Sequence, residues 1–244
     1  EPGEAKKSNL ETLESLTYCY QLIDTEEKRR EIIQKLLTSK ILSLDTETTG
    51  TEPMDAELVG MSFSIAENEA FYVPVPADQE EALKIVNEFR PVFENENSLK
   101  VGQNIKYDMI VLQNYGVQVK GPLFDTMIAH YVLQPELRHG MDYLAEIYLR
   151  YQTIHIDELI GPKGKNQKNM RDLAPKDVYR YACEDADVTL KLKNVLEKEL
   201  KENDAERLFY DIEMPLVPVL VNIERNGVLL DTEALKQSSA HFTA

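Results

Sequence analysis

Short apolar runs separated by polar turns dominate the first half of the chain, and longer amphipathic stretches dominate the second half. The run 41–45 is short, largely apolar and preceded by a lysine, which is typical of a buried central strand. The runs 58–65 and 70–75 predict two more strands, joined as a hairpin by the polar turn 67–69. Strands early, helices late and a helix between strands indicate an α/β domain around a mixed sheet flanked by helices.

Helical periodicity and short apolar runs account for the remaining segments. We expect helices at about 25–38, at 78–90, after Asn104 and from Pro175 to about 200, and short strands at 99–101 and 121–124. A further helical stretch begins near Asp204 and ends at Asn226–Gly227, and Asp231 is expected to cap another helix. The predicted organisation is a linker or tail over 1–20, a domain over 21–203 and a C-terminal helical extension over 204–244.

Four carboxylates occupy positions where this pattern predicts burial. Alternation along the first strand places Asp45 and Glu47 on the same face, at the end of the strand. Asp108 lies in the apolar stripe of one predicted helix, and Asp185 lies in the stripe of another, one turn after Tyr181. Buried carboxylates are too unfavourable to stay charged without compensation, and a shared divalent cation compensates all four. Oxygen ligands of this kind favour magnesium or manganese over zinc.

Each of these features also has a simpler structural explanation. An Asp-x-Glu after a strand is commonly a helix cap or a solvated turn, and a single Asp in a helix stripe often bonds a backbone amide. A Tyr and an Asp one turn apart are frequent on ordinary helices. The presence of four acids in three separate apolar segments favours the metal site, since the four histidines and two cysteines form no competing cluster.

Composition limits the class of protein. The chain of 244 residues can bury a full core, and two cysteines give no disulfide framework, which fits a reducing, cytoplasmic compartment. No run approaches the roughly 20 apolar residues of a membrane span. The chain begins at Glu1 without a methionine, so we expect it to be a piece of a longer protein.

The net charge of −16 argues at first against a nucleic-acid partner. Residues 161–176 are the exception, with five bases and one acid directly before the helix that carries Tyr181 and Asp185. Such a run is often only a solvated loop. Beside a metal site it is expected to contact phosphates, through Lys163, Lys165 and Lys168.

Four motifs match a known family, and they lie at 45–48 (DTET), 101–108 (VGQNIKYD), 164–167 (GKNQ) and 181–190 (YACEDADVTL). With them the chain resembles the 3′–5′ exonuclease (proofreading) domain of bacterial DNA polymerase I, a DEDD exonuclease with a tyrosine-type third motif. The resemblance covers about residues 20–235. Ribonuclease D-like enzymes share the exonuclease motifs, whereas the segment 213–228 resembles the start of the polymerase region.

The resemblance implies a ribonuclease H-like fold and stepwise hydrolysis of a DNA 3′ end with two divalent ions, Mg²⁺ or Mn²⁺. Residues matching Asp45, Glu47 and Asp185 hold one ion, and those matching Asp45 and Asp108 hold the second. Tyr181 matches the residue that orients the attacking water. The implied partners are a single-stranded or frayed 3′ end and the polymerase region of the same longer chain, whose truncated start is 204–244. The isolated chain is expected to be monomeric, without membrane contact.

The resemblance implies that Gln103 and Asn104 contact the terminal nucleotide or brace the second motif. At two other positions implied to contact DNA, the chain departs from the family. Thr51 stands where relatives carry a bulky apolar residue, and Met170 replaces an aromatic residue, so a planar stacking surface is lost. We therefore expect weak binding of single-stranded DNA. Two other hypotheses stay open: an exoribonuclease with the same metal site, and a catalytically silent domain that only supports a polymerase.

Overall fold

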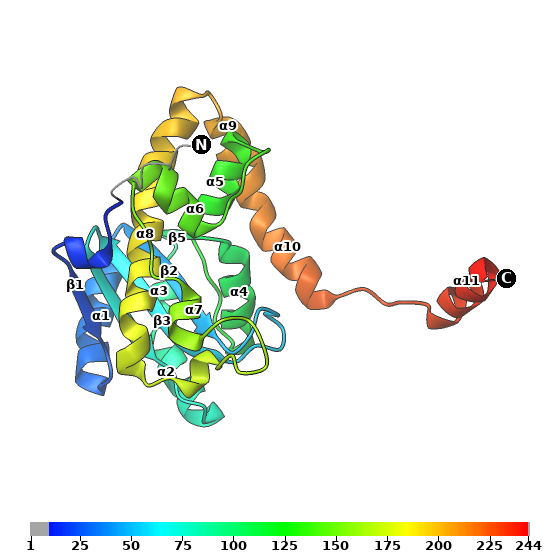
Figure 1. Ribbon diagram of the computed structural model, residues 1–244, viewed down its shortest axis with the longest axis horizontal. Helices are drawn as coiled ribbons and strands as arrows, with labels where there is room; N and C mark the ends of the chain where they lie inside the picture. The colour runs from blue at the N-terminus through cyan, green and yellow to red at the C-terminus, as the bar shows by residue number, and fades with distance from the viewer. Residues whose placement is uncertain (1–9, 244) are drawn as a thin grey trace, which may run out of the picture.

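A six-stranded mixed sheet forms the centre of the computed structural model, which describes residues 10–243 (Figure 1). β3 pairs antiparallel with β2 and β4, while β1 with β4, β2 with β5 and β5 with β6 pair parallel. The strand order is β1 (Cys19–Leu22), β4 (Glu69–Pro74), β3 (Leu58–Ala66), β2 (Ile41–Thr48), β5 (Leu99–Gly102) and β6 (Leu123–Asp125). The predicted mixed α/β architecture is confirmed.

Helices cover both faces of the sheet, and the predicted ones are confirmed to within a few residues. They are α1 (Glu26–Thr38), α2 (Gln79–Glu88), α3 (Arg90–Phe93), α4 (Ile105–Asn114), α5 (Thr126–Leu133), α6 (Met141–Leu144), α7 (Ile156–Ile160), α8 (Pro175–Glu202), α9 (Glu206–Leu208), α10 (Met214–Asn226) and α11 (Thr232–Thr243). Short turns of other helical types are η1 (Leu13–Ser15), η2 (Ala145–Leu149), η3 (Met170–Asp172) and η4 (Phe209–Glu213).

The N-terminal segment differs from the expected linker. Residues 1–9 lie outside the described part, but Leu13 is buried and β1 adds an edge strand beside β4. In β1, Tyr20 and Leu22 alternate toward the smaller cluster, but a strand of four residues with two inward side chains is too short for periodicity to predict it.

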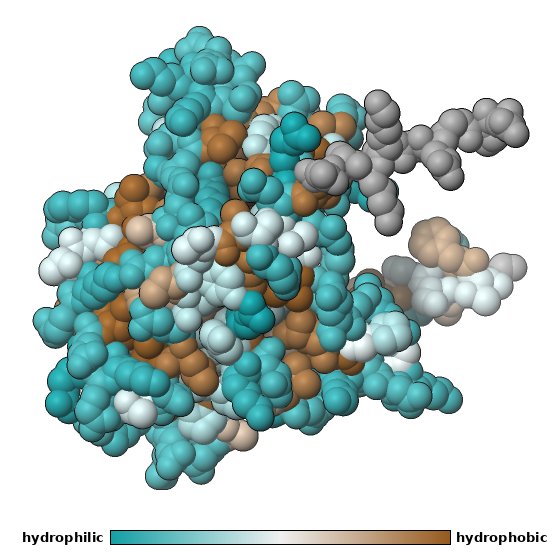
Figure 2. All heavy atoms as spheres, turned by 60° about the vertical axis from the view of Figure 1, so that its left-hand side comes forward, coloured by the Kyte–Doolittle hydropathy of each residue, from teal (hydrophilic) through white to brown (hydrophobic). Residues whose placement is uncertain are grey.

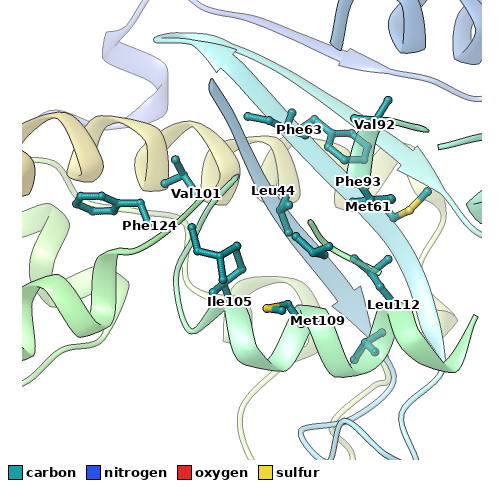
Figure 3. Close-up of a cluster of buried hydrophobic side chains, with 14 of the residues drawn as sticks. Leu44, Met61, Phe63, Val92, Phe93, Val101, Ile105, Met109, Leu112 and Phe124 are labelled. Atoms are coloured by element: carbon teal, nitrogen blue, oxygen red, sulfur yellow. The ribbon is translucent and has the colours of Figure 1, made fainter. Parts of the chain in front are cut away.

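Period-two alternation divides the strand side chains between two hydrophobic clusters. On β4, Phe71 and Val73 enter the larger cluster, while Ala70 and Tyr72 enter the smaller one. The larger cluster lies on the face covered by α4, where Figure 3 shows side chains from β2, β5 and α4 gathered together. Both faces of the sheet are therefore buried, as its central, mainly apolar strands require.

The smaller cluster lies under α8, the long helix that crosses strands β1 to β5 (Figure 1). Val178, Ala182 and Cys183 of α8 pack there against Val59 and Tyr72. Because the other strand faces point to α4, the carboxylate-bearing side of β2 is the one that faces α8.

The C-terminal extension begins inside the main core. Phe209 is fully buried and packs on Phe124 with ring centroids 4.8 Å apart. Met214, Val217 and Val221 continue this buried stripe along η4 and α10. α11 instead has no buried residue and stands apart from the body in Figure 1.

Hydrophilic residues dominate the face drawn in Figure 2, with apolar residues gathered in smaller patches between them. Within residues 10–243, no helix combines the length and the apolar character that a membrane crossing requires.

Replacing Phe209 with alanine tests whether the extension is part of the core. The variant should lose about 3–5 kcal/mol in free energy of unfolding, since it removes a buried aromatic ring and leaves a cavity. Phe242→Ala is the matched control, because Phe242 is 86% exposed and should change stability by less than about 0.5 kcal/mol. Urea titration followed by circular dichroism measures both, and equal midpoints for the two variants would show that the extension is only attached loosely.

Candidate active site

The structure brings three of the four predicted acids together from two elements, and the fourth lies near them on a third element. Ligand oxygens of Asp45, Glu47 and Asp185 all lie within 4.8 Å of one another, the first two on β2 and the third on α8. Asp108 on α4 is 3% exposed and close enough for the charge of Asp45 to raise its pKa. Three segments that are distant in sequence therefore meet at one acidic centre.

A register shift and a glycine shape the end of β2, where Glu47 lies. The β2–β3 register shifts between Glu47 and Thr48, and Glu47 lies opposite Gly60. A Cβ atom at Gly60 would fall 2.3 Å from the ring of Tyr72, so only glycine lets the ring lie against the strand there. The ring of Tyr72 then closes the smaller cluster beneath Glu47.

Asp108 is placed by the start of α4. Asn104 adopts the left-handed conformation (φ 61°, ψ 46°) and turns the chain from β5 into the helix. The carboxylate of Asp125 accepts the amides of Asn104 and Ile105 at 3.2 and 2.7 Å, and it also caps α5. One buried carboxylate therefore fixes the first turns of two helices, α4 and α5.

Thr46 supports Asp108 directly. Its hydroxyl donates a hydrogen bond of 2.6 Å to Oδ1 of Asp108, which lies 62 positions later in the sequence. Thr46 alternates with Asp45 and Glu47 along β2, so its side chain points to the α4 face of the strand. β2 thus presents Asp45 and Glu47 on the face toward α8. On its opposite face it presents the hydroxyl that donates to Asp108.

Like charges lie close together in a largely buried centre. Burial, followed by the repulsion of neighbouring carboxylates, raises the pKa of Glu47, Asp108 and Asp185 well above the usual range. Burial raises the pKa of Asp45 from 3.8 to about 6. Over that window the folded chain binds more protons than the unfolded chain, so without a cation its stability falls as the pH rises.

Tyr181 lies beside this centre, one turn before Asp185 on α8. Burial, and then the charges of Asp185 and Glu47, raise the pKa of its phenol above the ordinary value of 10. The phenol therefore keeps its proton at neutral pH and can donate a hydrogen bond.

Two buried oxygens fit a cation. Oε1 of Glu47 and Oδ1 of Asp185 have no hydrogen-bond partner among the described residues. Buried acceptors without a donor are rare, and they indicate a missing ligand where several converge. Carboxylate oxygens alone suit a hard divalent ion such as Mg²⁺ or Mn²⁺.

A cleft of about 560 Å³ opens beside the acids, between the β2–β3 loop and the segment before α8. Among the predicted DNA contacts, Thr51, Asn104, Lys168 and Met170 line this cleft. Met170 is only 4% exposed, because its side chain packs into the smaller hydrophobic cluster. Its contact with a base stays a prediction.

The remaining predicted DNA contacts, Gln103, Lys163 and Lys165, do not line the cleft. Nε2 of Gln103 donates to the carbonyl of His139 at 2.7 Å, and Oε1 accepts from the hydroxyl of Thr126, so its amide is occupied within the protein. Lys163 and Lys165 are exposed but do not line the cleft.

Other cleft residues were not predicted from the sequence. Tyr107 lines the cleft, and its hydroxyl bonds Oγ1 of Thr48 and the carbonyl of Gly50, each at 2.5 Å. Ile156 and Ile160 of α7 form the facing apolar wall. Tyr107 precedes Asp108 directly, a position that could have suggested it, whereas α7 is too short to show a period.

The sequence is similar to known proteins over most of its length. The family model described as 3′–5′ exonuclease matches residues 20–201. DNA polymerase I of Borreliella burgdorferi is 34% identical over 97% of this chain, and that of Pseudomonas aeruginosa is 40% identical over 83%. The chain covers 26% and 23% of these relatives, so it spans about a quarter of their length.

Solved structures share the fold at lower identity. A structure titled as the POL domain of Pol1 from M. smegmatis superposes with a TM-score of 0.71 at 18% identity, over 91% of this chain and 35% of that one. Brucella melitensis NrnC with bound Mg²⁺ gives a TM-score of 0.66 at 19% identity, over 87% and 95% of the two chains. The ribonuclease H-like fold that the motifs implied is confirmed, and the chain belongs to the 3′–5′ exonuclease family of DNA polymerase I.

Proposed function

We propose that this chain hydrolyses nucleotides stepwise from DNA 3′ ends, as the proofreading part of a DNA polymerase I. The observation that carries the proposal is the convergence of Asp45, Glu47 and Asp185, with unpartnered buried oxygens, beside a cleft of about 560 Å³. Two divalent ions, Mg²⁺ or Mn²⁺, would supply an activated water and stabilise the leaving 3′ oxygen.

The residues of the chain have separate tasks in this proposal. Asp45, Glu47 and Asp185 would hold one ion, and Asp45 with Asp108 would hold the other. The protonated phenol of Tyr181 donates a hydrogen bond that orients the attacking water, since burial keeps the phenol neutral. The cleft holds the strand that ends at these acids.

The DNA strand is bound along both walls of the cleft. Thr51 and Asn104 belong to one wall, and Lys168 and Met170 to the other. Lys163 and Lys165 add positive charge on the loop leading to that wall. The amide of Gln103 braces the turn before α4 through His139 and Thr126.

A polymerase region is the proposed partner within a longer chain. The inner stripe of α10 is buried. An outer stripe begins at Ile212 of η4, continues along α10 with Leu216, Val219 and Ile223, and is between 41% and 56% exposed. Isoleucines, a leucine and a valine in one helical stripe favour burial against another apolar surface. We propose the exonuclease domain over 21–203, with 204–244 beginning the polymerase region and bracing α4 through α10.

Substrate choice is the first test. In Mg²⁺, a 5′-labelled single-stranded DNA should give a ladder that shortens from the 3′ end, at least about tenfold faster than the matched RNA. A DNA with a blocked 3′ end is the control and should stay intact. Faster decay of the RNA would favour the exoribonuclease hypothesis, and decay of neither would favour the silent supporting domain.

Asp45→Asn tests the metal assignment. Cleavage should fall by at least about 100-fold, because a residue that bridges two ions contributes several kcal/mol to the transition state. In EDTA the variant should be at least as stable as the wild type, since one repelling charge is removed from the centre. Asp211→Asn, at a side chain that is 68% exposed, is the control and should change neither property. A marked loss of stability in EDTA would make Asp45 structural.

Tyr181→Phe separates water orientation from metal binding. Loss of one positioning hydrogen bond should lower kcat by about 10–100-fold and leave the affinity for Mn²⁺ nearly unchanged. Calorimetry with Mn²⁺ and single-turnover cleavage measure the two quantities. A large loss of Mn²⁺ affinity would place the phenol among the ligands or their necessary supports.

A further inference from the structure

One wall of the cleft is an irregular segment rather than part of the sheet. It runs from α7 through the basic loop to η3, and Ile156, Ile160 and Gln167 to Met170 line the cleft from it. α7 and η3 are only five and three residues long, so they have little rigidity of their own. The position of this wall depends on its attachment to the sheet.

Arg171 makes that attachment. One terminal nitrogen of its guanidinium donates to the carbonyl of Val75 at 2.5 Å, and the other donates to the carbonyl of Leu58 at 2.6 Å. These carbonyls lie just after β4 and at the start of β3. The side chain is 22% exposed and lies 3.8 Å from the carboxylate of Glu57.

Asn169 completes the link on the other side of Met170. Its amide nitrogen donates to the carbonyl of Thr49 at 2.6 Å, and its amide oxygen accepts from the backbone of Arg171 at 2.9 Å. Thr49 follows β2 directly, so the wall is tied to the ends of three adjacent strands, β2, β3 and β4.

The guanidinium suits this task because of its shape. It is planar and presents donors in a fixed fork, so it can span two carbonyls that diverge from neighbouring strands. Lysine has a single terminal nitrogen and cannot reproduce that geometry. Arg171 is not among the residues that line the cleft, so its effect on a substrate must pass through Asn169, Met170 and Lys168.

The geometry points to Arg171 as a positioning residue that sets the width of the cleft for the 3′-terminal strand. This inference rests on the proposed function, because the strand in the cleft is taken to be DNA. Without the two hydrogen bonds of the guanidinium, the residues around η3 are no longer held at a fixed distance from the β2–β3 loop. Binding of the strand weakens, while the acids on β2, α4 and α8 stay in place.

Arg171→Gln tests the inference. With a single-stranded DNA oligonucleotide in Mg²⁺, KM should rise about tenfold while kcat stays within about threefold, the pattern of lost ground-state binding. Binding is measured separately by fluorescence anisotropy in an Asp45→Asn background, where Kd should rise by the same factor of about ten. This second readout does not depend on cleavage, so it tests Arg171 even if the wild type digests no DNA.

Arg90→Gln is the matched control. Arg90 also donates to a backbone carbonyl, that of Gly116 at 2.7 Å, and pairs with Glu94, but it lies on α3 away from the cleft. Its KM and Kd should stay within about twofold of the wild type. An equal rise in both variants would mean that general loosening, not positioning, is responsible.

Arg171→Lys decides the case if the glutamine variant does not fold. The lysine side chain keeps the positive charge but can donate to only one of the two carbonyls. The Kd for the DNA oligonucleotide should therefore rise by about threefold. An unchanged Kd in a folded Arg171→Gln, or in Arg171→Lys when the former is unfolded, overturns the inference.

Discussion

Repulsion among Asp45, Glu47, Asp108 and Asp185 is the constraint on which the rest of the structure depends. Burial strengthens this repulsion and raises the pKa of each group. No local segment could hold such charges together, so each acid is placed on an element whose apolar face is fixed in a core. β2 and α4 are fixed by the larger cluster, and α8 by both. Packing energy from the cores offsets the unfavourable acidic centre.

Other buried charges on the same elements are fully paired, and they hold the frame. Asp187, two residues after Asp185, accepts the hydroxyl of Tyr20 and the amide of Asn68 at 2.7 Å each, and Lys191 at 2.8 Å. Glu184 accepts the hydroxyl of Tyr151 at 2.5 Å. On α8, Glu184 and Asp187 are thus hydrogen-bonded within the protein, whereas Oδ1 of Asp185 between them has no partner among the described residues.

The cleft is held differently from the acids. Its floor is the end of a buried sheet, but its outer wall consists of short turns that depend on side-chain hydrogen bonds to strand ends. Few apolar contacts and many polar ones give such a segment lower local stability than the core. This division lets the acidic centre stay fixed while the outer wall of the cleft depends on a few side-chain hydrogen bonds.

The sequence alone determined the acidic centre, because period two on β2 and the helical stripes around Asp108 and Asp185 each predict burial within a short window. It also determined the order of the main strands and helices along the chain and the cap at Asp231. Only the tertiary structure decided the edge strand β1, the occupation of the Gln103 amide, the burial of Met170 and the role of Arg171. These depend on carbonyls and side chains that lie far away in sequence. Local periodicity holds no information about such partners, so packing alone decides them.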